Sequence, residues 1–297
     1  NLNANSVAWP GVGNTVTLDA GGDATVADAE LDATSWDGAS LTVQRNVGGT
    51  NTPISSDLFS FNSSGYTLSG GNLQTGATTF GTFTNINGVL TISFNANATN
   101  TLVRDVMRGI QYRNDTPAGD ATIRFALSDG TTSTTADVAV TTDYVYVTNT
   151  TDTAVIDLTN GVSFSEAVAI AAADVTGSQT LILSSAFTGS MSLAGNLAIT
   201  ESLAIDGNST SGLVIAGSTI TLSGGTTLHL TNASGTLTIG STVAGSGALS
   251  KSGAGTLALS STTNNSGWIG ALSVSGGSLN VSGSTSMPSL PTGTLTL

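Results

Sequence analysis

The residues best suited to catalysis are few in this sequence of 297 residues. It contains no Cys and a single His, His229, which alternates with apolar residues between Thr227 and Leu230. His229 is either a general base or metal ligand, or an outward-facing residue of a strand. No acidic residue follows it in the chain, and no G-x-S-x-G motif of a serine hydrolase is present. We therefore expect His229 to be a surface residue, although a Ser-His-Asp triad built from distant segments stays open.

Carboxylates are the second group of residues that could do chemistry. Calcium prefers clustered carboxylate and carbonyl oxygens from loops, and the candidates are Asp28, Glu30, Asp32, Asp120 and Asp129. The first three alternate, so in an extended segment they would share one side. The spacing matches neither an EF-hand nor a Gly-rich nonapeptide repeat. We predict a Ca²⁺ site from Asp28, Glu30, Asp32 and Asp129, with turns capped by Asp side chains as the alternative.

Aromatic residues offer one candidate for glycan binding. The Trp residues are Trp9, Trp36 and Trp268, and Trp268 follows a segment rich in Asn, Ser and Gly. It is either an exposed platform for a sugar or a loop aromatic that folds over the edge of a coil. We favour the second interpretation.

Charge and composition exclude several classes of protein. Only 6 Lys and Arg accompany 19 Asp and Glu, which gives a net charge of −13. Nucleic-acid binding needs clustered basic residues, so we expect no nucleic-acid partner. No apolar run approaches the roughly 20 residues of a membrane helix, and we expect no membrane insertion. Low charge with positive mean hydropathy and 37 Gly indicates a folded, turn-rich, all-β extracellular protein.

The region 1–143 has the pattern of a β-sandwich. Alternating apolar residues predict strands at 15–19, 40–45, 88–94, 121–127 and 136–141. The apolar positions between Thr101 and Ile110 instead follow helical spacing and predict one short helix that ends near Gly109.

Part of this region resembles a known module. The stretch 101–130, with Ile110, Tyr112 and Asn114 followed by Ser128-Asp129-Gly130, resembles a cadherin-like module of large bacterial adhesins. The acidic stretch 28–32 resembles the early acidic turn of the same family. The resemblance implies a cadherin-like β-sandwich that binds calcium at its end.

The region 144–297 reads as a solenoid of short strands. After a strand at 144–148, Ser163 and Glu166 form a capping box that predicts a helix near 163–173 covering the open end of the stack. Strand signals then recur at 180–183, 197–200, 203–206, 213–216, 220–222, 227–230 and 236–239. Three strands per coil and about 20 to 25 residues per coil would give about five to six coils.

Two motifs in this region resemble known families. The helix followed by Ile199–Gly207 resembles the start of bacterial right-handed β-helix domains. The stretch 245–281 resembles the autotransporter-associated β-strand repeat, with Asn265–Trp268 in place of its usual turn. The matching positions are Gly245, Gly247, Leu249, Lys251, Gly253, Gly255, Thr256, Leu257, Leu259, Gly277, Leu279 and Val281. The resemblance implies a right-handed parallel β-helix in a secreted or cell-surface bacterial protein.

These observations favour a non-enzymatic structural or adhesive fragment, extracellular or on the bacterial surface, that serves as a stalk, spacer or adhesin. The chain begins without Met and stops within strand-like residues at 294–297, so we expect a piece of a larger protein. Its partners would be a host-surface, matrix or glycan ligand, or neighbouring modules of the same chain. One alternative is a polysaccharide-acting β-helix enzyme, although the coil face that carries acids, Lys and Arg in such enzymes would here hold little besides Lys251. Another is a self-assembling surface-layer or filament subunit.

Overall fold

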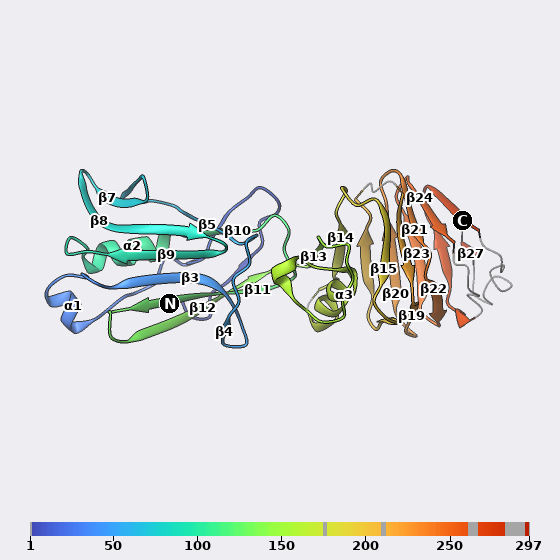
Figure 1. The fold of residues 1–297 in the computed structure, drawn as a ribbon, viewed down its shortest axis with the longest axis horizontal. Coiled ribbons are helices and arrows are strands. Elements are labelled where there is room, and N and C mark those ends of the chain that lie inside the picture. Colours follow the sequence, from blue (N-terminus) through green and yellow to red (C-terminus); the bar gives the residue numbers. More distant parts are fainter. Residues whose placement is uncertain (1, 175–176, 209–211, 261–266, 283–294, 297) are drawn as a thin grey trace. The chain divides into compact units, whose positions relative to one another are not determined.

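The computed structural model describes residues 2–174, 177–208, 212–260, 267–282 and 295–296. Strands dominate, and three α-helices are present in these residues. The chain forms two compact units, residues 1–142 and 143–297, which are described separately (Figure 1). Asn265, Ser266 and Thr294, which belong to the predicted turn and terminal strand, lie outside the described residues.

The first unit is built on one large sheet, with strand order β1-β12-β11-β3-β9-β8-β7-β6 and β4 beside β3. All of its neighbouring strands are antiparallel except β1, which runs parallel to β12. The strands are β1 (Ser6–Ala8), β3 (Ser40–Val47), β4 (Thr50–Asn51), β6 (Thr67–Ser69), β7 (Asn72–Thr75), β8 (Thr78–Ile86), β9 (Val89–Phe94), β11 (Ala121–Ser128) and β12 (Ser133–Thr141).

A smaller sheet and a helix complete the core of this unit. The sheet has the order β2-β10-β5, from Val16–Thr17, Ile110–Arg113 and Leu58–Phe61. Helix α2 (Asn100–Gly109) begins at Thr99, whose side chain accepts a hydrogen bond from the backbone N–H of Leu102. Buried residues of both sheets and of α2 form one apolar cluster. The predicted helix and the five predicted strands are confirmed.

The second unit is a parallel β-solenoid of about four turns, made of three sheets. The first sheet stacks β13 (Tyr144–Val147), β14 (Thr180–Leu183), β17 (Leu203–Asp206), β20 (Thr227–Thr231), β23 (Ala248–Ser252), β25 (Leu272–Val274) and β27 (Leu295–Thr296). The second stacks β15 (Gly189–Leu193), β18 (Leu213–Gly217), β21 (Thr236–Ile239), β24 (Thr256–Leu259) and β26 (Ser278–Val281). The third stacks β16 (Leu197–Ile199), β19 (Thr219–Leu222) and β22 (Thr242–Gly245).

The register of these sheets gives the length of a coil. Leu237 pairs with Leu257, and Leu203 with Leu228, so successive coils are spaced by 20 to 25 residues, as predicted. The prediction of five to six coils was wrong, because the described residues between β13 and β14 form no coil. They contain instead a short 3₁₀ helix (Leu158–Asn160) and helix α3 (Phe164–Ala173).

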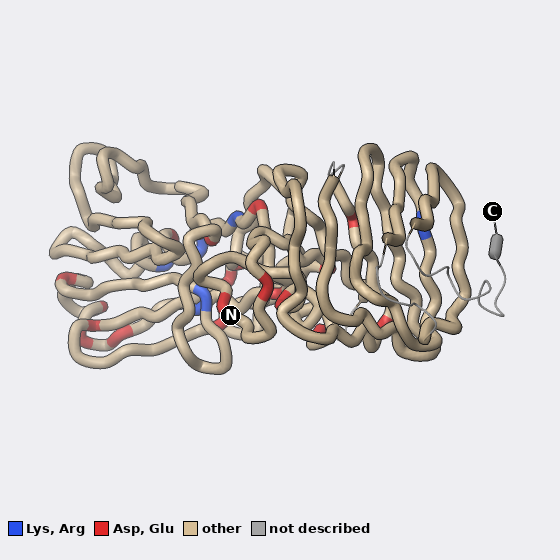
Figure 2. Tube along the Cα trace, turned by 45° about the vertical axis from the view of Figure 1, so that its right-hand side comes forward, with Lys and Arg blue, Asp and Glu red and all other residues tan. Residues whose placement is uncertain are grey.

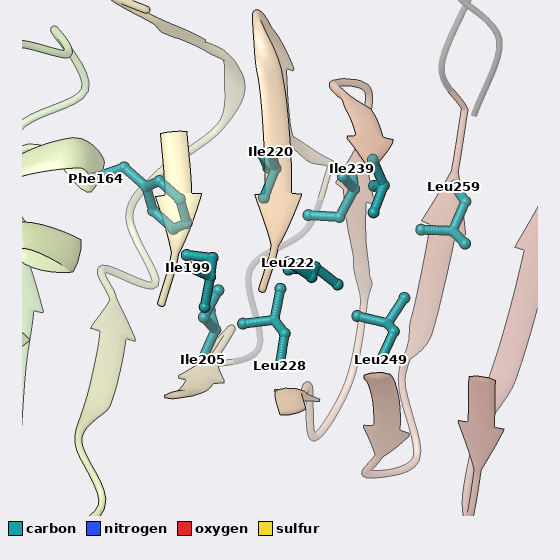
Figure 3. Close-up of a pocket in the computed structure, with 10 residues that line it drawn as sticks. Phe164, Ile199, Ile205, Ile220, Leu222, Leu228, Ile239, Leu249 and Leu259 are labelled. Atoms are coloured by element: carbon teal, nitrogen blue, oxygen red, sulfur yellow. The ribbon is translucent and has the colours of Figure 1, made fainter. Parts of the chain in front are cut away.

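The interior of the solenoid is a continuous stack of apolar side chains. Figure 3 shows residues from all three sheets turned toward one another, with Phe164 of α3 beside them. They leave a space of about 10 Å³, which is at most enough to admit one water molecule and has no polar lining to bind it. Phe164 thus covers the first coils, as expected of a cap, and the capping box of Ser163 and Glu166 is present.

Candidate functional site

Asp28 begins a helix and does not lie in an extended segment. Its side chain accepts hydrogen bonds from the backbone N–H groups of Glu30 (3.0 Å) and Leu31 (2.9 Å), which starts the short helix α1 (Ala29–Ala33). The expectation that three alternating carboxylates share one side of an extended chain was therefore wrong. An Asp that follows a loop and precedes helix-forming residues caps its own backbone in preference to remaining extended.

Asp32 is held by side chains from two parts of the unit. Its Oδ1 accepts hydrogen bonds from Trp36 Nε1 (3.1 Å) and Asn100 Nδ2 (2.8 Å), and its Oδ2 from the backbone N–H of Asp28 (3.2 Å). The hydrogen bond from Asn100 is the main cause that lowers the pKa of Asp32. Glu30 on the same helix is exposed.

Asp129 lies in the turn between β11 and β12. Its carboxylate accepts from the backbone N–H and hydroxyl groups of both Thr131 and Thr132, at 2.6 to 2.8 Å. These hydrogen bonds lower the pKa of Asp129 strongly. Asp120 likewise accepts from the backbone N–H of Thr142. Asp129 thus has the turn-capping geometry that was the alternative to calcium binding, whereas Asp120 makes a long-range contact with the residue that follows β12.

The acidic residues gather without forming a metal centre in the described part of the chain. Figure 2 shows acidic residues at the end of the first unit where α1 lies. Within the described ranges, no group of three or more His, Cys, Asp or Glu side chains is placed to hold a metal ion. Calcium binding by Asp28, Glu30, Asp32 and Asp129 stays a prediction.

His229 lies on the outer surface of the first solenoid sheet. The register places it between Ala204 and Ser250 of the adjacent coils, and its Nδ1 is hydrogen-bonded to Ser250 Oγ. Asp206 lies two residues beyond Ala204, diagonal to His229, and accepts from the backbone N–H of Asn208. The stacking therefore creates a Ser-His pair with a diagonal carboxylate, which the sequence analysis missed because the acid precedes His229 by one coil.

Lys251 is buried inside the solenoid, with 2% of its surface exposed. The expectation that it lies on an outer coil face was wrong, because it alternates in phase with the inward Leu249. Its Nζ donates to three backbone carbonyls, those of Ser252 (3.2 Å), Gly253 (3.0 Å) and Gly276 (2.7 Å). Burial lowers the pKa of Lys251, while the three carbonyls favour its charged form.

Glycines make the carbonyl site around Lys251 possible. Gly253 and Gly277 have φ angles of +79° and +66°, and a Cβ on Gly277 would lie 2.7 Å from Nζ. Glycine at positions 253 and 277 of the repeat motif therefore serves a physical purpose, because backbone from two successive coils must approach one ammonium group closely.

Trp268 is buried, with 3% of its surface exposed. Its Nε1 donates to the carbonyl of Gly247 at 2.9 Å, and its backbone forms a bridge with Gly245 of the preceding coil. It cannot serve as an exposed platform for a sugar. The interpretation as an aromatic folded over a coil edge agrees with this geometry.

A buried ionic network in the first unit was missed by the sequence analysis. Arg45 donates to both oxygens of Asp57 (2.8 Å each), and Tyr112 Oη (2.6 Å) and Asn114 Nδ2 (2.9 Å) donate to Asp57 Oδ1. Arg45 and Asp57 are 2% and 0% exposed. Burial and the Asp57 charge raise the pKa of Tyr112 well above its usual value. The only indication of this network in the sequence was the alternation of Ile110, Tyr112 and Asn114, which places Tyr112 and Asn114 on the inward face of a strand.

Comparison with protein-family models, curated proteins and solved structures found no match. The functional interpretation therefore depends on the geometry of this chain. No helix among the described residues is long and apolar enough to cross a membrane.

The chemistry available to these groups is limited by their partners. Lys251 and the Arg45–Asp57 pair are buried and fully engaged with protein atoms. The Ser250–His229 pair is exposed, but the pockets with room for a ligand that the structure shows, of about 310 and 330 Å³, lie in the first unit.

Proposed function

We propose that this chain is a non-enzymatic structural and adhesive part of a large secreted or cell-surface bacterial protein. In this proposal the solenoid acts as a spacer, and the first unit meets the partner. The resemblances to a cadherin-like module and to the autotransporter-associated repeat support an extracellular or bacterial surface location.

The observation that carries the proposal is how the solenoid uses its ionisable groups. Lys251 binds three carbonyls in the interior. Glu166 is 0% exposed and accepts from the backbone N–H groups of Asp157 and Ser163. General acid–base chemistry needs such groups exposed beside a substrate. Lys251 and Glu166 instead bind backbone groups inside the solenoid, which is the role expected of ionisable residues in a structural scaffold.

An assay on polysaccharides tests the non-enzymatic part of this proposal. The full chain is incubated with a panel of acidic and neutral polysaccharides, and reducing ends and unsaturated products are measured. We expect no release above a buffer control. Release that His229→Ala or Ser250→Ala abolishes would overturn the proposal.

The same assay decides the second candidate, a hydrolase that uses the Ser250–His229 pair. The specific observation in its favour is the hydrogen bond between Ser250 Oγ and His229 Nδ1. A catalytic triad requires a carboxylate hydrogen-bonded to the His. Among the described residues, no carboxylate is hydrogen-bonded to His229. Ala204→Asp, which would place an acid directly beside His229, provides a gain-of-function arm. Activity in this variant alone would show that the wild-type pair lacks the orienting acid.

Adhesion is tested by binding of the labelled full chain to arrays of glycans and matrix proteins. We expect saturable binding that the separately added unlabelled chain displaces. The adhesive role would be contradicted if the chain bound no member of these arrays, or if the unlabelled chain could not displace the signal. The spacer role would then need a separate measurement.

A further inference from the structure

A polar pocket of about 310 Å³ opens in the first unit, between helix α2 and the turn that joins β5 to β6. The turn contributes Asn62, Ser64 and Gly65, and the second half of α2 contributes Asp105, Arg108 and Gly109. The three turn residues are exposed, so the pocket is open to solvent. Its volume lies at the lower end of small-molecule pockets, which are roughly 300 to 1,000 Å³.

Asp105 presents one carboxylate oxygen to this pocket. Its Oδ1 accepts hydrogen bonds from Nε (3.3 Å) and Nη2 (3.1 Å) of Arg104, which does not line the pocket. Its Oδ2 lies close to Gly65, since a Cβ on that glycine would be 3.8 Å from it. The side chain of Asp105 is 29% exposed, so Oδ2 is placed to accept a hydrogen bond from a ligand.

Arg108 places hydrogen-bond donors beside that acceptor. It follows Asp105 by three residues, so the two side chains lie on the same face of α2. Its Nε donates to the carbonyl of Ala24 at 2.8 Å, which holds the guanidinium at the rim of the pocket. The two charged lining residues therefore have opposite signs. This combination suits a ligand that both donates and accepts hydrogen bonds and carries no net charge.

A buried hydroxyl beside the pocket lacks a hydrogen-bond acceptor. Tyr66 is 4% exposed, and its Oη has no hydrogen-bond partner among the described residues. The hydroxyl lies close to Gly109, because a Cβ there would come within 3.0 Å of Oη. Burial and the charge of Asp105 raise the pKa of Tyr66, so it stays a neutral donor. A donor without an acceptor costs free energy, and a ligand oxygen at the floor of the pocket would supply the acceptor.

Two other classes of small ligand fit the charges less well. An acidic sugar would meet Asp105 and the field of a chain whose net charge is −13. A free amino acid would need Asp105 to bind its ammonium group, but this carboxylate is already paired with Arg104. A neutral pyranose has adjacent hydroxyls, which can donate to a carboxylate and accept from a guanidinium at the same time.

We propose that this pocket binds one neutral pyranose unit of a glycan. Asp105 Oδ2 accepts from a sugar hydroxyl, and Arg108 and Ser64 hydrogen-bond to neighbouring sugar oxygens. This inference rests on the adhesive role proposed above, and it names the class of partner and the residues that meet it. The pocket lies in the first unit alone and is independent of the spacer role of the solenoid.

The test titrates the isotope-labelled full chain with the methyl pyranosides of glucose, mannose and galactose, and with glucuronate and glycine for comparison. NMR spectra of the backbone amides measure affinity and locate the site. We expect saturable binding of at least one methyl pyranoside with a Kd of about 1 mM, and shifted signals in residues 62–66 and 104–109. Tighter binding of glucuronate or glycine than of every methyl pyranoside would overturn the proposal.

Two variants assign the site, each with a matched control. Asp105→Asn keeps the shape of the side chain but removes the charge of the acceptor, and should raise the Kd about tenfold. Asp137→Asn is its control, because Asp137 pairs with Arg124 in the same way and does not line the pocket. Ser64→Leu narrows the pocket from an exposed turn and should also weaken binding, which keeps the test valid if the Asp105 variant fails to fold. Ser63→Leu, at the neighbouring exposed position, should leave the affinity unchanged.

The glycan and matrix arrays described above separate this inference from the adhesive role. Loss of glycan binding by Asp105→Asn and Ser64→Leu, with both controls unchanged, would support the site. Wild-type affinity in either folded variant, or no binding of any methyl pyranoside, would overturn it. The adhesive role would still stand in that case if these variants bound the arrays as the wild type does.

Discussion

Lys251 is the only Lys or Arg in residues 143–297, and it lies in the interior with no carboxylate beside it in the described part of the solenoid. The energetic question is whether three carbonyl hydrogen bonds outweigh the cost of burying the ammonium group. Hydrogen bonds to charged groups contribute about 1.5–3 kcal/mol each, while burying an ion without a counter-ion costs several kcal/mol. The two effects are of similar size, so the decisive cost arises when the donor is removed and the carbonyls stay buried.

Lys251→Met should therefore destabilise the solenoid. Met keeps most of the side-chain volume but donates no hydrogen bond to the carbonyls of Ser252, Gly253 and Gly276. We expect the free energy of unfolding to fall by about 1–3 kcal/mol, the cost of unsatisfied buried acceptors. Chemical denaturation monitored by circular dichroism measures the change. Ser250→Ala, at the outward neighbouring position, is the control and should change stability by no more than about 0.5 kcal/mol. A methionine variant more stable than the wild type would show that burying the ammonium group costs more free energy than its hydrogen bonds supply.

Glu201 gives the solenoid a measurable pH dependence. Burial raises the pKa of Glu201, nearby Asp174 adds to the rise, and its Oε1 has no hydrogen-bond partner among the residues that the structure describes. The folded state therefore favours the neutral acid. The stability that this preference contributes is complete below the ordinary value of 4.5 and is lost as the pH rises through the raised pKa.

Glu201→Gln should accordingly melt at a higher temperature than the wild type at pH 7 and at the same temperature at pH 4. Parallel melting curves of the two proteins across this range measure the difference and cancel the titration of all other groups. Asp206→Asn, whose carboxylate accepts a hydrogen bond from Asn208, is the comparison that should not gain stability at pH 7. A Glu201→Gln difference independent of pH would contradict the raised pKa.

At the scale of elements, Leu257 stacks between Leu237 and Leu279 of the adjacent coils, and the other inward rows of the solenoid stack in the same way. Leu257 is 2% exposed, and its row continues in each coil above and below. An acidic residue here would be buried without a partner.

Leu257→Asp should cost several kcal/mol and unfold the solenoid at a markedly lower temperature. Asn280→Asp places the same charge on an exposed position of the next coil and should leave the melting temperature nearly unchanged. Equal melting of the Leu257 variant and the wild type would mean that Leu257 points outward and that the register is wrong.

The elements that the sequence predicted are those whose apolar residues repeat with a clear period. Strands β3, β9 and β11 alternate between buried and partly exposed positions along most of their length, and the buried residues of helix α2 are spaced three to four apart. β8 was missed because only Phe80 and Gly81 of its nine residues are buried, so no period appears. α1 was missed because it has no buried residue and exists through its Asp28 cap.

The candidate site was harder to predict, since sequence distance hides contacts between coils. His229 meets Ser250 only because one coil separates them, and Lys251 could be placed inside or outside until the phase of Leu249 was known. The Arg45–Asp57 pair joins β3 to the loop before β5, a long-range contact without a local signal.

At the scale of the whole molecule, the net charge of −13 makes cation binding the property most worth measuring. Calcium bound at Asp28, Glu30, Asp32 and Asp129 would add about 2.7 kcal/mol to the free energy of unfolding of the first unit at a calcium concentration of 100 times its Kd, and so raise its melting temperature. We expect millimolar calcium to raise this melting transition and chelator to lower it, with the solenoid transition unchanged.

Screening must be separated from site binding in this experiment. A sodium chloride series at matched ionic strength is the control, because simple screening relieves self-repulsion without a specific site. Equal melting in calcium, sodium and chelator would mean that these carboxylates only cap turns and α1.

The parallel stacking of the coils has a mechanical consequence. The hydrogen bonds between strands run from coil to coil, along the axis of the solenoid. A pull that separates the two ends of this stack stretches those bonds and peels strands away one after another, so the coils detach in sequence and not all at once. Each coil of 20 to 25 residues would release roughly 70 to 85 Å of extended chain. A solenoid tethered at both ends would then lengthen in small repeated steps under load, and each step would dissipate part of the mechanical energy.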